Sequence, residues 1–310
     1  MNTATHRAFP QSWSARVRGK TLQMGLRTKA RLSLVWLACV LGATVSAGEL
    51  ESVSAPPDQV RTEFKLAPFY EKCVLVGGLP IVSSGKVSDA ALREAADIVW
   101  NMLAGRDDLL QALVRNKVRV AVMAPNEFTL DIPEHSDFTP AKYWNRRARG
   151  LGATHARPAV SCGEENLLGL RGDPYRAENI LVHEFAHTIH LLAVVDVDPT
   201  FDKRLKTTFQ AAKASGLWLG TYAATNHSEY WAEGVQTWFD TNRVNDHDHN
   251  HVCSRNQLRE YDPDLARLLE EVFGENDWSY RAPSLRPTAA HLAGFDRSRA
   301  SRFQWPAEKP

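Results

Sequence analysis

The sequence predicts a single α+β domain in which a small mixed sheet is followed by a helical half. Two observations lead to this prediction. Short apolar and alternating segments are confined to the first half of the chain, and apolar residues at helical spacing dominate the second half. With 310 residues, 44% of them hydrophobic, the chain is long enough to bury a real core.

The first half is expected to form the sheet. The predicted strands are 73–76, 79–82, 117–123 and 150–162. Alternation of polar and apolar residues in 117–123 predicts a half-buried strand. The glycine-rich segment 150–162 predicts an edge strand, and Ser88 is placed to begin a helix between the strands.

The second half is expected to be helical. The predicted helices run from Asp173-Pro174 to about Val195, over 199–214, from Asn226 to about residue 241, and over 263–273. The proline- and arginine-containing segment 281–310 predicts a loosely ordered tail. The globular domain is therefore expected to span 67–280.

The N-terminal segment 1–47 is predicted to be a signal peptide. It carries seven basic residues and no acid, and its apolar run 32–45 is too short to span a bilayer comfortably. The run ends at Ser46-Ala47, which is typical of a cleavage site, and Met24 is an alternative start that would give a compact basic region. The polar segment 48–66 reads as a linker. A secreted or periplasmic protein is expected, without stable membrane association after cleavage; an uncleaved membrane anchor is the alternative.

The charge and the cysteine content argue against nucleic-acid binding and against a cysteine-based metal site. Beyond residue 47 there are 30 basic and 36 acidic side chains, so the mature chain lacks the basic footprint of a nucleic-acid-binding protein. Cys73, Cys162 and Cys253 remain after cleavage. Their odd number permits at most one internal disulfide, and their spacing does not indicate a metal site.

A metal-binding motif lies inside the first predicted helix of the second half. His183, Glu184 and His187 form H-E-x-x-H. Four residues correspond to about one helical turn, so both imidazoles face the same way, as two ligands of one zinc ion must. Glu184 is next to the first ligand, where it can act as general base towards a zinc-bound water without binding the metal.

A third protein ligand is expected from the helix that Asn226 begins. Glu229 and Glu233 are four residues apart and share a face, so one could bind zinc while the other orients a ligand histidine. The alternative for Glu229 is a capping box with Asn226, and for Glu233 a solvated carboxylate. His190 is interpreted as a helix-face or pocket-wall residue, because three consecutive turns cannot easily converge on one tetrahedral centre.

Two further groups of residues have alternative interpretations. The segment 246–251, which contains His247, His249 and His251, could bind a second metal, although a solvated loop is the more ordinary interpretation. Trp231 and Trp238 are seven residues apart, at helical spacing, and are expected in the core rather than in a ligand pocket.

Read together with the H-E-x-x-H segment, residues 222–233 resemble the catalytic domain of anthrax lethal factor and related gluzincin zinc peptidases. The resemblance covers about residues 175–240. It implies a zincin-like fold with one zinc per chain, Glu229 as the third ligand and Glu233 as the carboxylate that orients a ligand histidine. It also implies that Tyr222 is a donor to the transition state. It says nothing about the substrate.

The predicted function is a secreted zinc-dependent endopeptidase with a peptide or protein substrate, in which Glu184 is the base. The peptide is expected to align along the edge strand in 150–162. One alternative is a zinc hydrolase of another amide or ester, for instance in cell-wall peptides. The other is a zinc-bearing binding protein without turnover, which the presence of Glu184 and Tyr222 argues against.

Overall fold

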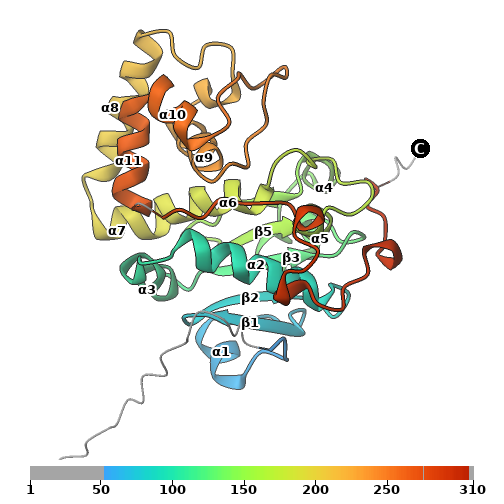
Figure 1. Cartoon of the computed structure of the whole chain (residues 1–310). Coiled ribbons are helices and arrows are strands. Elements are labelled where there is room, and N and C mark those ends of the chain that lie inside the picture. Colours follow the sequence, from blue (N-terminus) through green and yellow to red (C-terminus); the bar gives the residue numbers. More distant parts are fainter. Residues whose placement is uncertain (1–51, 275, 307–310) are drawn as a thin grey trace, which may run out of the picture. The chain divides into compact units, whose positions relative to one another are not determined.

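The computed structural model describes residues 52–274 and 276–306, and the predicted signal peptide, including Met24, lies outside the described residues. The described chain has the mixed α+β organisation that the sequence predicts, with a small mixed sheet and a helical half (Figure 1). Helix α6, Ile180–Ile189, lies between the two, against strand β5 on one side and helix α9 on the other.

The sheet has the strand order β1-β2-β3-β5-β4. Its strands are β1 Lys72–Val76, β2 Leu79–Ser83, β3 Arg119–Met123, β4 Gly150–Leu151 and β5 Ala159–Gly163. The pairs β2–β3 and β3–β5 are parallel, whereas β1–β2 and β4–β5 are antiparallel. The β1–β2 hairpin confirms the predicted strand pair. Gly77 and Gly78 form its two-residue turn with φ of 54° and 91°, values that favour glycine.

Two predictions about the strands need correction. Strand β3 is buried along its whole length, not half-buried, because it lies between two parallel neighbours in the middle of the sheet. Its one charged residue, Arg119, is tolerated there because it pairs with Glu134 at 3.1 Å. The segment 150–162 is not one strand but two, and only the two-residue β4 forms the edge.

The helices around the sheet are α1 Asp58–Glu63, α2 Asp89–Met102, α3 Asp107–Arg115, α4 Ala141–Arg147 and α5 Glu164–Leu168. Short 3₁₀ turns occur at Thr129–Asp131, Pro133–His135, Tyr222–Ala224 (η4), Pro283–Leu285, Ala290–Leu292 and Arg297–Arg299. The Ser88 hydroxyl caps α2 by accepting the Ala91 amide at 3.3 Å, as predicted.

The helical half contains α6, a π turn at His190–Val194 (η3), α7 Val195–Val197, α8 Phe201–Ala214, α9 His227–Trp238, α10 Arg255–Tyr261 and α11 Pro263–Phe273. The predicted start of α6 at Asp173-Pro174 is wrong. Asp173 instead accepts the Tyr175 amide in a turn, and Asn179 caps the helix through the Val182 amide. Trp231 and Trp238 are fully buried, which confirms their predicted place in the core.

One stretch of the described chain, Ile180–Val197, is long and apolar enough to cross a membrane by composition alone. It is largely buried inside the fold, as expected for the central helix of a globular domain.

The segments flanking the predicted domain are more structured than expected. Within the predicted linker, Ser54 pairs with Cys73 of β1, and Phe64 is buried against the sheet. In the predicted tail, Leu292 and Phe303 are buried. The described part of the tail contacts Glu94 of α2.

Glu94 of α2 is a fully buried carboxylate and requires hydrogen-bond donors for its two oxygens. The tail supplies them: Arg286 and His291 bind its two oxygens at 2.5 and 2.7 Å. Glu94, Asp97 and His291 are also close enough in space to hold a metal ion. Because Arg286 already pairs with both carboxylates, this group is better described as the attachment of the tail to α2.

Candidate metal centre and adjoining pocket

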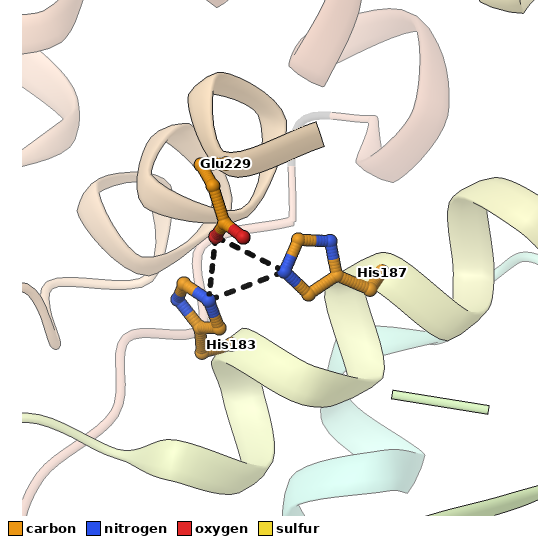
Figure 2. Close-up of side chains that lie close together, drawn as sticks. All are labelled: His183, His187 and Glu229. Atoms are coloured by element: carbon orange, nitrogen blue, oxygen red, sulfur yellow. Dashed lines mark hydrogen bonds and ion pairs between the residues drawn. The ribbon is translucent and has the colours of Figure 1, made fainter. Parts of the chain in front are cut away.

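The structure brings the three predicted ligands together (Figure 2). His183 and His187 project from one face of α6, and Glu229 projects towards them from α9. The two histidine Nε2 atoms are 3.2 Å apart, and Oε2 of Glu229 is 3.2 and 3.3 Å from them. Three donor atoms therefore form a nearly equilateral triangle.

The dimensions of this triangle fit a zinc ion. Donors about 2.0–2.1 Å from a tetrahedral zinc are about 3.3–3.4 Å from one another, close to the separations found here. Two imidazoles and a carboxylate are also a ligand set that catalytic zinc sites use. The predicted ligands thus have both the chemistry and the spacing for one metal ion.

The tautomer of His183 is fixed by a residue that the sequence analysis missed. Gln236 of α9 has its Oε1 2.7 Å from His183 Nδ1, while its Nε2 donates to the Glu178 carboxylate at 3.2 Å. The amide nitrogen faces an acceptor, so the amide oxygen must face His183, and Nδ1 must carry the proton. The lone pair of Nε2 is consequently directed at the donor triangle.

Glu233 is placed one turn after Glu229, as predicted, but it is not the closest partner of the ligand histidine. Its Oε1 is 3.6 Å from His183 Nδ1, outside hydrogen-bond range, and Gln236 takes that contact. Oε2 of Glu233 is 3.1 Å from Nε2 of His249, whose Nδ1 is 2.9 Å from Asp246. Glu233 therefore connects α9 to the loop that follows it.

The electrostatics of the centre favour a bound cation. Burial opposes protonation of His183, but the carboxylates of Glu229, Glu184 and Glu233 outweigh it and raise the pKa of His183 to about 10. Burial likewise opposes ionisation of Glu229, yet the hydrogen bonds of both histidines lower its pKa. Three carboxylates thus stabilise positive charge at the position where a metal dication would bind.

The capping-box alternative for Glu229 is not what the structure contains. Asn226 alone caps α9, accepting the amides of Ser228 and Glu229 at 2.8 and 3.0 Å. The Glu229 carboxylate points towards His183 and His187 (Figure 2). Cap and ligand are therefore separate residues, which allows each role to be tested alone.

Glu184 and Tyr222 line a pocket of about 260 Å³ beside the donor triangle, together with His183. The Glu184 carboxylate is half-buried and makes no hydrogen bond or ion pair with any residue of the described chain. Burial, together with the carboxylates of Glu229 and Glu184, raises the pKa of the Tyr222 phenol. Tyr222 consequently keeps its proton at neutral pH and can donate it in a hydrogen bond.

The edge strand β4 runs alongside α6 at the level of Glu184. A Cβ on Gly150 would lie 2.5 Å from the Ile180 side chain and 2.9 Å from the Ser161 carbonyl oxygen. One on Gly152 would lie 3.0 Å from Cβ of His187. The absence of side chains therefore lets the strand approach the helix that carries the metal-binding motif.

Arg149 holds the start of β4 in place. Its guanidinium binds both oxygens of Glu165 at 2.5 and 3.0 Å, and both side chains are fully buried. We expect Arg149→Met to leave the Glu165 charge buried without its partner and to lower the free energy of unfolding by about 3–5 kcal/mol. Urea titration measures this change. The matched variant Arg147→Met, at an exposed position two residues earlier, should change it by less than about 1 kcal/mol, because it loses only the contact with Trp144.

The remaining histidines do not join the centre. His190 is fully buried in the π turn against Phe201 and Trp231, so it is a core residue of the helix and not a pocket wall. Burial lowers its pKa to about 4, which keeps it neutral. Within 246–251, His249 is bound to Glu233 and His247 is exposed, and this segment does not form a metal-binding group in the described chain.

Comparison of the chain with protein-family models gives no match, and no curated protein is significantly similar to it. Any function has to follow from the geometry and chemistry of the site itself.

Proposed function

We propose that the protein is a zinc-dependent hydrolase of the gluzincin type, most simply an endopeptidase, with a zincin-like arrangement of sheet and helices. The observation that carries the proposal is the donor triangle of His183, His187 and Glu229 beside the unpaired carboxylate of Glu184. A purely structural zinc site needs no such free carboxylate in an open pocket, and it usually closes its fourth position with a protein ligand.

Zinc bound there would supply a Lewis acid that polarises a carbonyl and lowers the pKa of water. The residues of the chain carry out the proton transfers. Glu184 accepts a proton from the attacking water and delivers it to the leaving amine, since its carboxylate makes no hydrogen bond or ion pair with the described residues. The Tyr222 hydroxyl donates a hydrogen bond to the oxygen on which negative charge develops.

Strand β4 supports a peptide as the substrate. It is a sheet edge, it borders the pocket at Gly150, and its neighbour β5 occupies only one of its sides. An extended peptide can add to such an edge through its backbone, which presents a carbonyl to the pocket without demanding a particular side chain. Another amide or an ester held in the same pocket is the second candidate.

Metal content is the first test. The protein lacking residues 1–47, prepared without chelator, should hold about one zinc per chain by elemental analysis. His183→Ala and His187→Ala should lose most of it. His291→Ala should retain the zinc, because His291 belongs to the separate group with Glu94 and Asp97. A preparation that takes up no zinc even after incubation with the ion would refute the proposal.

Hydrolysis is the second test. The zinc-loaded protein should cleave denatured protein or peptides, and a chelator should stop the cleavage until zinc is restored. Parallel incubation with cell-wall fragments separates the two substrate classes. If only those fragments are cleaved, the endopeptidase assignment is wrong and the hydrolase assignment stands.

A further inference from the structure

Nearly every charged side chain that lines the pocket has a partner. Arg243 binds Glu178 at 3.1 Å, and Glu233 binds His249 at 3.1 Å. Two charged lining residues differ, because neither makes a hydrogen bond or ion pair with the described residues: the proposed base Glu184, and Arg147.

Arg147 is the last residue of α4, three positions before β4 begins at Gly150. Its guanidinium is exposed and lies over the Trp144 ring, 5.5 Å from the centroid, which restricts its orientation without neutralising it. Arg147 lines the same pocket as Tyr175 and Tyr222.

A second hollow of about 500 Å³ adjoins the first at Arg147. Pro140, Lys142, Tyr143 and Arg146 complete its lining. Helix α4 contains no acidic residue, and the Lys142 ammonium, like Arg147, makes no ion pair within the described part of the chain. The pocket and this hollow are therefore joined by an arginine whose charge is not compensated by any of the described residues.

We propose that Arg147 forms an anion-binding subsite. It would bind a carboxylate of the substrate, so that the protein acts on acidic peptides. The inference rests on the proposed function in taking the substrate to be a peptide. A guanidinium can bind both oxygens of a carboxylate in one plane, which makes an arginine more selective for a carboxylate than a simple point charge would be. Lys142 extends the same preference along the second hollow.

Pocket chemistry also explains why an arginine is needed there. The unpaired Glu184 would repel an acidic peptide, and Arg147 on the same pocket offsets that repulsion. The carboxylate can come from an Asp or Glu side chain or from the end of a peptide. These sources share the same recognition chemistry, and the experiment separates them.

The test measures binding, not turnover. Immobilised, zinc-loaded Glu184→Gln protein is incubated with peptides from a digested proteome, and retained peptides are identified by mass spectrometry. We expect enrichment of Asp and Glu, and a loss of about tenfold in affinity for acidic peptides when Arg147→Glu is added. Arg147→Lys should retain part of the preference. Arg267→Glu has the same charge change at a distant exposed site and should behave as the parent.

Blocking the peptide C-termini by amidation distinguishes the sources: retention that survives indicates a side chain, and retention that disappears indicates the terminus. Retention that does not depend on Arg147, or no retention of any peptide with a free C-terminus, overturns the subsite. Cleavage without acid preference would leave the proposed function intact and reject only the subsite. If peptides are retained in an Arg147-dependent way but the zinc-loaded parent protein hydrolyses none of them, the subsite stands and the proposed hydrolase function is rejected.

Discussion

Glu184→Gln should reduce hydrolysis by about 10²–10⁴-fold while the protein keeps its zinc. The amide has nearly the same shape as the carboxylate but cannot accept the proton of the attacking water. Because Glu184 is not part of the donor triangle, metal content should stay at the level of the parent. Initial rates on a cleaved peptide, together with elemental analysis of the same sample, measure both quantities.

The stability of the folded protein should change little in Glu184→Gln. The Glu184 carboxylate has no hydrogen bond or ion pair within the described chain, so its replacement removes no direct contact and only part of the negative charge around His183. An unchanged unfolding midpoint would separate lost chemistry from lost structure. Glu271→Gln, on the far surface at α11, controls for preparation and should remain fully active. A Glu184→Gln rate close to the parent rate would show that Glu184 is not the base.

The parts of the fold that local sequence signals determine were predictable. The Gly77-Gly78 hairpin, the Ser88 cap and helix α11 each depend on residues within a few positions of one another. The burial of β3 was not predictable in this way, because it depends on neighbours that are distant in sequence.

The tail shows the same limit. Prolines and arginines indicate a loose segment, and only the buried carboxylate of Glu94, almost two hundred positions earlier, turns Arg286 into an anchor. An arginine in a sequence carries no mark of the partner that it will find. Long-range ion pairs of this kind are visible only when the chain is folded.

In the candidate site, too, the residues related by local spacing were predicted, and other contacts were missed. Helical spacing predicted that His183 and His187 share a face, and the downstream helix predicted a carboxylate ligand. Gln236 was missed, although it lies three positions after Glu233 on the same helix, and this spacing was a signal that could have found it. For His249 the sequence analysis offered a metal ligand or a solvated loop residue, and neither interpretation included its actual partner Glu233, which comes from another element.

Glu229→Ala should weaken zinc binding far more than Glu233→Ala. Glu229→Ala removes one of the three donor atoms. Glu233→Ala leaves all three in place and removes only a carboxylate near His183 Nδ1. An effect of about 10–100-fold is typical of such supporting residues. Gln236→Leu should fall in this same range, because it removes the acceptor that fixes the His183 tautomer.

Asn226→Ala makes the comparison decisive, because it removes the helix cap without touching the donors. It should lower the stability of the metal-free protein by about 0.5–2 kcal/mol and leave the zinc dissociation constant unchanged. Glu229→Ala differs from Asn226→Ala in that the zinc affinity itself should be lost, because a donor atom is removed. Competition with a chromophoric chelator gives the affinities, and urea unfolding gives the stabilities. If Glu233→Ala binds zinc more weakly than Glu229→Ala, the two carboxylates have exchanged roles and Glu233 is the metal ligand.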